Sequence, residues 1–507
     1  MKPLWTQLVL GFLICIFFQA CVPEQQEDQQ DLPNIVLILA DDMGYGDIKA
    51  YNLNSALATP NLDELAAQGM RFTDAHSGSS VCTPTRYGLM TGSYAWRTRL
   101  KKGVLSGYSQ HLIEPSQLTL ASLLKEKNYH TGVVGKWHLG VDFPWTTDTL
   151  PKQIDNLNYY LKDLSLIDYS EPIQNGPNTL GFDYSFLVPG SLDMSPYVYL
   201  ENGKATTIPD SISPLRRFPD FVRQGEIAPD FTHEGCLDRL TEKATNFIAE
   251  QAQSQNPFFL YFPLTGPHKP ALAATRFKGK SGIGPYGDLV LQVDWTVGEV
   301  LNTLRENGVE ENTLVIYTSD NGSYMYRLPT EGPDHVEDST LQGFHVQTHQ
   351  SNDRWRGTKA DIWEAGHRVP FLVRWPDKVR PGSTQDTTVC LTDVMATIAE
   401  ILAIDLPQDE ALDSHSFLPL LTGMEGFERP PVVHHSVAGM FSIRHNNWKL
   451  VLGNGSGGRQ QPRGKPFEKP YQLYDLAKDP EEKRDLSGEE LEVMEALEKK
   501  LEEIRAY

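Results

Sequence analysis

The chain has 507 residues, a length that allows a large buried core and more than one domain. Its 66 acidic and 45 basic residues give a formal net charge of -21, which argues against a general nucleic-acid-binding surface, and we expect no nucleic-acid partner. If the substrate is an anion, cations near the site must overcome this negative field.

The N-terminus is typical of an export signal. Lys2 precedes an apolar run from Leu8 to Phe18 that is too short to span a membrane comfortably. The run ends in "FFQAC", which is similar to a bacterial lipobox, and there Cys21 would become the lipidated first residue of the mature chain. We expect a signal peptide with a lipobox-like end over residues 1–21 and a solvated tether over 22–32, with simple secretion as the alternative.

Five apolar runs predict buried strands. The first, "NIVLILADD", is rich in β-branched residues, and the others are "HTGVVGKWHLG", "PFFLYFPLTGPH", "TLVIYTSDNG" and "VPFLVRWP". Helical patterns lie between them in "TPNLDELAAQG", "PSQLTLASLLKEKN", "CLDRLTEKATNFIAEQAQ" and "LQVDWTVGEVLNTLRENG". Strands that alternate with helices predict an α/β fold with a doubly wound, mostly parallel sheet.

The pattern changes after about residue 425. "PVVHHSVAGMFSIRHNNWKLVLG" and "YQLYDL" predict short antiparallel strands, and "GEELEVMEALEKKLEEIRAY" predicts a terminal amphipathic helix. We therefore expect a main catalytic domain over 33–425 and a C-terminal α+β subdomain over 426–507. The stretches 141–230 and 322–353 are loop-rich, as expected of insertions that cover a substrate.

Paired oxygen ligands follow two of the predicted strands. Asp41 and Asp42 end one strand, and Asp320 and Asn321 follow another. Because the carboxyl ends of parallel strands meet at one edge of a sheet, these side chains suit a hard divalent cation, Ca²⁺ or Mg²⁺. The alternative is that both pairs are only turn residues.

The stretch "SSVCTPTRYGLMTG" places Cys82 at the start of a predicted helix, with Pro84 near its first turn. Taken alone, a buried thiol before a helix would explain it. Cys236 and Cys390 stand in helix-like apolar contexts and are expected to be buried free thiols, so we expect no disulfide framework.

"CTPTR" fits C-x-P-x-R, and with "GLMTG" after it the segment resembles the signature of the type I, formylglycine-dependent sulfatases. Further motifs occur in the order of that family, and the surroundings of "GFDYSF" and "SLDMSPY" are most similar to the branch of arylsulfatase A and the N-acetylgalactosamine-6-sulfatases. The resemblance implies an alkaline-phosphatase-like fold. The motif residues are Lys136 and His138 in "GKWHLG", His268 in "GPHKP", Asp320 and Asn321 in "SDNG", Lys359 in "RGTKADIWEAGHRVP" and Ser191 in "GFDYSFLVPGSLD".

In that family the cysteine is oxidised to formylglycine, and the hydrate of this aldehyde is the nucleophile. One hydroxyl attacks sulfur, and deprotonation of the other then releases sulfate and returns the aldehyde. The resemblance implies one Ca²⁺ per chain, with Mg²⁺ as the alternative, because the same oxygens hold either ion. Its ligands would be Asp41, Asp42, Asp320, Asn321 and the modified Cys82.

The resemblance also implies roles for the remaining motif residues. Arg86 would hold the formylglycine and the charge on the metal side, while Lys136 and Lys359 neutralise sulfate oxygens. His138 would be the base that assists release, and His268 would donate a proton to the departing alcohol. His268 and Lys359 could instead only bind sulfate oxygens, and this alternative stays open.

The sequence departs from the family pattern at two positions. Thr85 stands where serine is most frequent in the cysteine motif, which puts the efficiency of maturation in question although a hydroxyl is kept. Lys269 stands where threonine is frequent, and we relate it to substrate contacts or to no function.

The signals together predict a sulfuric ester hydrolase that acts on a galactose- or hexosamine-type polysaccharide or oligosaccharide outside the inner membrane of a bacterium. We expect it in the periplasm or at the cell surface, with a membrane contact only through the N-terminal lipid. Its partners would be the sulfated glycan and a formylglycine-generating or anaerobic sulfatase-maturating enzyme. The candidate substrate contacts are Asp193, Tyr197, Tyr199, His349, Arg354, Glu364, His367 and Arg368.

Two other functions compete with this one. A phosphoesterase of the alkaline-phosphatase superfamily would share the strand-end metal ligands, but it would use a serine or threonine nucleophile and usually two zinc ions. A non-catalytic lipoprotein that binds sulfated glycans would leave Cys82 unmodified.

Overall fold

One large mixed sheet organises the chain in the computed structural model, which describes residues 32–424 and 427–506. The predicted signal peptide and nearly all of the tether lie outside the described residues. The contacts of Pro33–Tyr507 form one compact unit, and the expected boundary at 425/426 falls on the two internal residues that are not described.

The large sheet has ten strands among the described residues, and its centre is parallel. β1 pairs in parallel with β10 and β11, and β10 pairs in parallel with β4. Antiparallel pairs occur on both sides of this centre, between β11 and β14 and between β5 and β6. In spatial order the strands are β15 (Ser383–Gln385), β2 (Met70–Phe72), β14 (Phe371–Arg374), β11 (Thr313–Ser319), β1 (Asn34–Asp41), β10 (Phe258–Pro267), β4 (His130–Lys136), β5 (Tyr184–Val188), β6 (Leu200–Glu201) and β7 (Lys204–Ala205).

The central strands are buried along their whole length, as their continuous apolar runs require. Every residue of β1, β10 and β11 is buried. A strand covered on both faces has no polar side to present to water, so it is apolar throughout instead of alternating. The five predicted strands are all present, and the prediction of a doubly wound, mostly parallel α/β sheet is confirmed.

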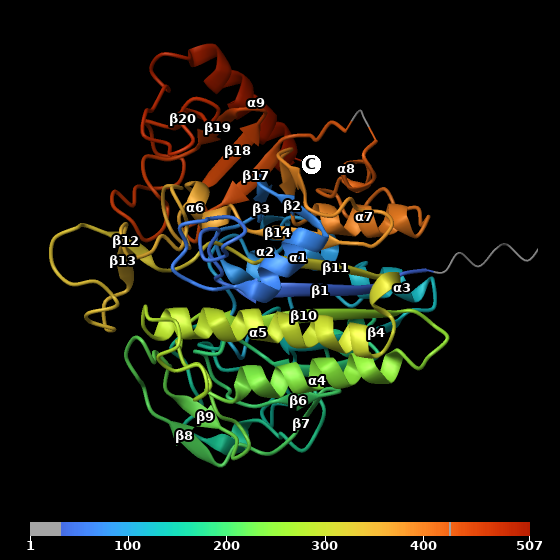
Figure 1. The fold of residues 1–507 in the computed structure, drawn as a ribbon. Helices are drawn as coiled ribbons and strands as arrows, with labels where there is room; N and C mark the ends of the chain where they lie inside the picture. Colours follow the sequence, from blue (N-terminus) through green and yellow to red (C-terminus); the bar gives the residue numbers. More distant parts are fainter. Residues whose placement is uncertain (1–31, 425–426, 507) are drawn as a thin grey trace, which may run out of the picture. The chain divides into compact units, whose positions relative to one another are not determined.

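Helices cover both faces of this sheet (Figure 1). α4 and α5 pack against β10 and against each other, and α1 joins them by packing on α5. On the other side α2 contacts α3 and α7. The helices are α1 (Pro60–Gln68), α2 (Cys82–Thr91), α3 (Leu120–Lys125), α4 (Cys236–Gln251), α5 (Pro285–Glu306), α6 (Glu364–His367), α7 (Asp393–Ile401), α8 (Leu418–Thr422) and α9 (Leu491–Ala506).

The long insertions hold little regular structure, as predicted. They contribute two-stranded sheets from short segments, and most of the remaining residues are turns and loops. The strands of these small sheets are β8 (Ser211–Ser213) with β9 (Gly225–Ile227) and β12 (Tyr326–Leu328) with β13 (Gly343–His345), while β3 (Ala75–His76) pairs with β16 (Val389–Cys390).

The C-terminal part has the predicted α+β arrangement. A four-stranded antiparallel sheet runs in the order β17 (Val432–His435), β18 (Phe441–His445), β19 (Trp448–Val451) and β20 (Gln472–Asp475). α9 packs on β18 and β19 through Leu497 and Leu501 (Figure 1). The core of the C-terminal sheet also includes Tyr94 and Trp96, so this sheet packs on the segment that follows α2.

Candidate functional site

Five neighbouring strands deliver polar side chains to one edge of the large sheet. β1 and β11 pair with Ala40 opposite Ser319, so the next residues, Asp41 and Asp320, emerge side by side. This adjacency is what the parallel register requires. The residues at or just after the strand ends are Asp41 and Asp42 (β1), Asp320 and Asn321 (β11), His268 (β10), Lys136 (β4) and Ser191 (β5).

The carboxylates of this edge are paired with buried cations. The ammonium of Lys136 lies 2.8 Å from Oδ2 of Asp41, and the guanidinium of Arg86 lies 2.7 Å from Oδ2 of Asp320. Burial raises the pKa of Asp41 to about 7, against the opposing effect of Lys136. Burial alone would also raise the pKa of Asp320, but Arg86 and Lys136 outweigh it and lower that pKa to about 2.

Cys82 is the first residue of α2, so the amino end of this helix points into the site. Its Sγ lies 3.6 Å from Oδ1 of Asp41 and 3.3 Å from Nζ of Lys359. The side chain is buried, and burial together with Asp320 raises the pKa of the thiol to about 12. The unmodified thiol therefore stays protonated near neutral pH.

The carboxylate of Asp42 accepts hydrogen bonds from two other segments. Nζ of Lys359 lies 2.6 Å from its Oδ1, and Nδ2 of Asn321 donates to the same oxygen over 2.7 Å. The backbone of Asp42 has φ 68°, a left-handed conformation that aspartate tolerates better than most residues. The sharp turn carries the carboxylate back over the strand end, beside Lys359.

Both predicted histidines are neutral in this environment. Nε2 of His138 donates to the carbonyl of Leu105 over 2.8 Å, which leaves Nδ1 buried without a hydrogen-bond partner among the described residues. Burial and Lys136 lower the pKa of His138 well below its ordinary value. Burial and Lys359 do the same for His268, whose Nδ1 faces Ser191 and whose Nε2 lies 3.6 Å from Oδ2 of Asp42.

The site suits a hard divalent cation. Oδ2 of Asp42 and Oδ1 of Asn321 are buried and make no hydrogen bond within the described chain. Ligand atoms of Asp41, Asp42, Cys82 and His268 all lie within 4.8 Å of one another. Carboxylate and amide oxygens are the ligands that Ca²⁺ and Mg²⁺ prefer, so the residues present fit such an ion.

Of the predicted substrate contacts, Asp193 interacts electrostatically with Lys136 of this cluster. It forms a buried ion pair with Arg223, and that pair together with Lys269 lowers the pKa of the carboxyl despite burial, which raises it. Tyr197 is fully buried and donates to the carbonyl of Arg223 over 2.6 Å, and Tyr199 stacks on Phe186. The two tyrosines are packed in the protein and are not presented to a ligand.

His349 and Arg354 also have other surroundings than expected. Nε2 of His349 lies 2.8 Å from Oδ1 of Asp47, and both side chains are fully buried. Arg354 is exposed, with its guanidinium 5.0 Å from the ring centre of Trp355. Within the described residues, neither side chain forms a hydrogen bond or ion pair with the Cys82 cluster.

The placement of His367, Arg368 and Glu364 does not support their expected sugar contacts. They lie in a buried network against the C-terminal sheet, where Arg368 pairs with Glu364 and Asp74 and His367 stacks on His434 at 3.8 Å. His76, His367 and His434 converge there, but Arg368, Arg444 and Lys449 surround them. The three cations are paired there with Asp74 and Glu364, so the network is largely satisfied by its own ion pairs.

Two residues near the site were not predicted. Tyr324 is fully buried, its hydroxyl has no partner within the described chain, and its ring meets that of His268 at 6.3 Å. Arg459 comes from the C-terminal part, on a loop bonded to Asp361. No sequence motif marks either residue, and only the glycines of "GNGSGGRQ" hint that this loop approaches another backbone closely.

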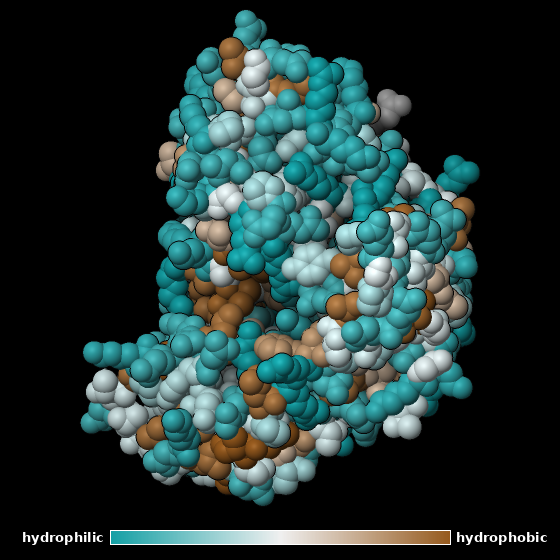
Figure 2. Space-filling model, turned by 90° about the vertical axis from the view of Figure 1, so that its left-hand side faces the viewer, coloured by the Kyte–Doolittle hydropathy of each residue, from teal (hydrophilic) through white to brown (hydrophobic). Residues whose placement is uncertain are grey.

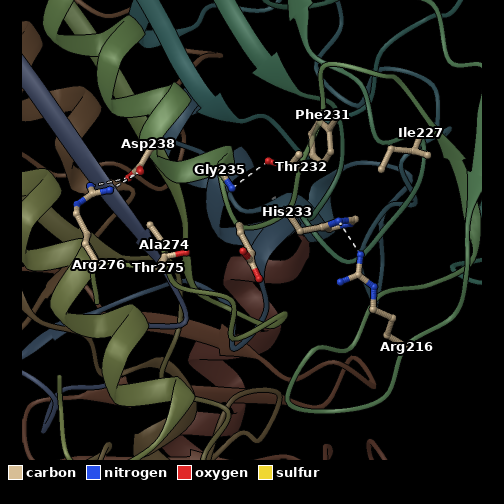
Figure 3. Close-up of a pocket in the computed structure, with 11 residues that line it drawn as sticks. Arg216, Ile227, Phe231, Thr232, His233, Gly235, Asp238, Ala274, Thr275 and Arg276 are labelled. Atoms are coloured by element: carbon tan, nitrogen blue, oxygen red, sulfur yellow. Dashed lines mark hydrogen bonds and ion pairs between the residues drawn. The ribbon is translucent and has the colours of Figure 1, made fainter. Parts of the chain in front are cut away.

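The molecular surface is hollowed on the face turned to the viewer in Figure 2, with hydrophobic residues on one wall of the hollow and a hydrophilic rim. A cavity of about 620 Å³ is lined by residues between Arg216 and Asp238 and by residues 274–276 (Figure 3). There Arg216 points to His233, and Arg276 pairs with Asp238. None of the residues predicted for the reaction lines this cavity.

Comparison with known proteins gives consistent matches. Residues 33–404 match the model of the sulfatase family, and residues 354–507 match the C-terminal model of N-sulphoglucosamine sulphohydrolase. An N-acetylgalactosamine-6-O-sulfatase of Bacteroides thetaiotaomicron is 32% identical, covering 93% of each chain, and human arylsulfatase A is 31% identical over 94% of this chain and 88% of its own. A solved structure from work on glycosaminoglycan metabolism in Bacteroides thetaiotaomicron superposes with TM-score 0.80 at 31% identity, covering 94% of this chain and 100% of that one.

Proposed function

This chain belongs to the sulfatase family and hydrolyses sulfate esters, and on that premise we propose that it desulfates a galactose- or hexosamine-type glycan through a formylglycine made from Cys82. The observation that carries the proposal is the convergence on Cys82 of buried carboxylates and buried cations. The glycan class is supported by the 32% identical relative, an N-acetylgalactosamine-6-O-sulfatase.

The state of the thiol favours modification over direct use of the cysteine. Burial raises the pKa of the Cys82 thiol to about 12, so the thiol is protonated near neutral pH. A reactive cysteine normally has a lowered pKa, because the thiolate is the nucleophile. An aldehyde at this position supplies, as its hydrate, a hydroxyl nucleophile that does not depend on the thiolate.

We propose that Ca²⁺ is held by Asp41, Asp42, Asp320 and Asn321 together with the modified residue 82. When bound, the ion supplies positive charge that lowers the pKa of a neighbouring hydroxyl and offsets sulfate charge. The three carboxylates of the site are matched by Arg86, Lys136 and Lys359, so their formal charges cancel. A divalent ion then makes the site net positive, which suits an anionic ester despite the acidic chain.

The cations and Ser191 are proposed to bind the sulfate group. Lys136 lies 3.3 Å from Oγ of Ser191, and Lys359 lies 3.3 Å from Sγ of Cys82, the reacting residue. Arg86 donates to Asp320 and to the carbonyl of Lys136 and thereby orients two members of the site. Positive charge held in place before the reaction stabilises charge that develops on the sulfate oxygens.

The two histidines are proposed to move protons. His138 donates through Nε2 to Leu105, so its free Nδ1 can accept a proton as sulfate is released. His268 stands between Ser191 and Asp42, and a bound sulfate would raise its lowered pKa, so that it carries a proton for the departing alcohol. Binding of sulfate oxygens by His268 alone is the alternative.

The N-terminal pattern supports export to the periplasm or cell surface with a lipid anchor at Cys21, and the cysteine motif supports maturation by a formylglycine-generating or anaerobic maturating enzyme. Within the described residues, none of the helices combines the length and apolar character needed to cross a bilayer.

Mass spectrometry of the peptide spanning Val81–Arg86 tests the proposal, using protein from a host that matures sulfatases. We expect formylglycine at position 82 and turnover of an aryl sulfate at a rate that scales with the matured fraction. Cys82→Ala should abolish turnover. A thiol at position 82 in protein that still turns over sulfate esters would contradict the proposed nucleophile, and faster turnover of the matching aryl phosphate would favour a phosphoesterase.

A further inference from the structure

Lys269 is a cation at the edge of the site without a carboxylate partner. It directly follows His268, its side chain is only partly exposed, and its ammonium lies 4.5 Å from the ring centre of Phe221. Within the described chain no carboxylate lies within ion-pair distance of it. The nearby Asp193 is already paired with Arg223, so the charge of Lys269 is left for another group.

Arg459 reaches the same region from the C-terminal part. Its backbone N–H donates to Oδ1 of Asp361 over 2.6 Å, and a Cβ on the preceding Gly458 would meet the carbonyl of Ala360 at 2.3 Å. The loop is thus fixed against the residues that follow Lys359. The guanidinium has a buried Nη1 without a hydrogen-bond partner among the described residues, and no ion pair of this arginine occurs there.

The two cations influence each other and the sulfate site. Burial and then Arg459 lower the pKa of Lys269 to about 8, and the charge of Arg459 also opposes that of Lys359. Lys269 directly follows His268, whose Nε2 lies 3.6 Å from Asp42, and the backbone of Arg459 is bonded to Asp361, two residues after Lys359. The chain has a net charge of -21, yet these two cations have no carboxylate partner within the described residues, so an anion from outside the chain can bind them.

We infer that Lys269 and Arg459 bind a second anionic group of the substrate, beside the sulfate that is removed. The preferred substrate is therefore a glycan in which the ester is accompanied by a uronate carboxylate or a second sulfate. This inference rests on the proposed function and narrows it. A uronate carboxylate is a planar oxyanion and a sulfate is a tetrahedral one. An ammonium and a guanidinium bind either by charge-assisted hydrogen bonds.

The experiment compares kcat/KM of the full, matured chain on three substrates. These are a monosulfated N-acetylhexosamine, the same sugar with a second sulfate, and the same sugar linked to a uronate. The variants are Lys269→Gln and Arg459→Gln, and Lys465→Gln is the matched control because Lys465 is exposed on the same C-terminal loop.

We expect wild-type protein to prefer at least one of the two dianionic substrates. Each variant should reduce that preference about 10- to 100-fold, mainly through KM, as loss of a charge-assisted hydrogen bond predicts, while the control keeps it. The dianionic substrate whose kcat/KM falls most in the variants identifies the second anion as a carboxylate or a sulfate. Equal losses on all three substrates, or a wild-type protein without preference, would overturn the inference.

Two further readouts keep the test decisive. If a variant does not fold, the preference of the wild-type protein for dianionic substrates is measured from about 0.05 to about 0.5 M salt. This preference should decrease with salt if the charges of Lys269 and Arg459 cause it. A preference that salt leaves unchanged counts against the inference. If the protein turns over the monosulfated sugar but shows no preference for a dianionic substrate, the inference fails and the proposed function stands. If it turns over none of the substrates, the inference and the proposed function both fail.

Discussion

The ammonium of Lys359 lies 3.3 Å from Sγ of Cys82 while it also lies 2.6 Å from Oδ1 of Asp42. One lysine therefore links residue 82 to the carboxylate set. Burial would lower the pKa of Lys359, but Asp42 and Cys82 outweigh burial and raise it, so the lysine is charged throughout the neutral range.

Replacing this lysine should cost catalysis. Lys359→Ala removes a fixed positive charge beside the reacting residue, and we expect kcat/KM for a sulfate ester to fall about 10²- to 10³-fold. Lys359→Arg should not restore it, since a planar guanidinium does not replace a compact ammonium in a fully packed site. Steady-state kinetics check both variants against Lys499→Ala, an exposed lysine of α9. A loss of less than about threefold would show that Lys359 has no role in the reaction.

Loss of the divalent ion should abolish activity even in protein whose residue 82 is fully converted to formylglycine. Chelation should abolish turnover, and Ca²⁺ should restore it more fully than Mg²⁺. Asn321→Ala and Asp42→Asn should each lower the bound metal below one ion per chain and reduce activity by at least about 100-fold. Elemental analysis of the purified variants measures the metal, with the exposed Asp163→Asn as control. Full activity in a metal-free preparation is incompatible with this assignment.

Removing Asp320, a proposed metal ligand, should also cost stability. Asp320→Ala leaves the fully buried guanidinium of Arg86 without its main partner, 2.7 Å away. An unpaired buried charge costs about 3 to 5 kcal/mol, so we expect a clearly lower melting temperature for Asp320→Ala and a smaller loss for Asn321→Ala. Thermal unfolding followed by circular dichroism compares the two. Equal melting temperatures would mean that Arg86 finds another acceptor.

Thr85 should influence maturation and not the reaction itself. Its Oγ1 lies 3.1 Å from the carbonyl of Ser79 and 3.3 Å from that of Val81, bonds that a serine can also make. Thr85→Ser should therefore change the fraction of formylglycine at position 82 while activity per matured molecule stays the same. Peptide mass spectrometry and active-site-normalised rates separate the two effects. A changed rate per matured molecule would place Thr85 in the reaction.

The fold and the centre of the site were accessible from sequence because both depend on local patterns. Continuous apolar runs predicted the central strands, and the polar residues after them predicted one edge that carries Asp41, Asp320 and Asn321. The position of β14 was not predictable in the same way, since its antiparallel pairing with β11 depends on how the chain returns over the sheet. The apolar run of β14 has the same appearance in either direction.

Substrate contacts were harder to predict for a physical reason. His367 and Arg368 stand eight and nine residues after Lys359, yet a short helix turns them into a buried network beneath the C-terminal sheet. Arg459 shows the reverse case, since it lies about 100 residues from Lys359 in sequence and reaches the same region through a glycine-rich loop. Only tertiary packing decides which of these side chains faces the substrate.

The buried histidine network should make the folded protein sensitive to mild acid. Burial lowers the pKa of His76, and burial with neighbouring histidines and cations lowers those of His367 and His434 well below the ordinary value. The unfolded chain binds protons at these residues below about pH 6.5, whereas the folded chain does not. Stability is therefore highest above pH 6.5 and falls as pH decreases, by up to about 1.4 kcal/mol per pH unit for each histidine.

Replacing one of these histidines should flatten that dependence. His434→Asn keeps a donor for the carbonyl of Ser77, to which Nδ1 now donates over 2.9 Å, but it removes one titrating ring. We expect a lower melting temperature at pH 7.5 and a smaller further decrease on going to pH 5.5 than in the wild type. His130→Asn, at the start of β4, serves as control because His130 lies outside this network. If His434→Asn lost stability with acid as steeply as the wild type, the buried network would not be the source of the acid sensitivity.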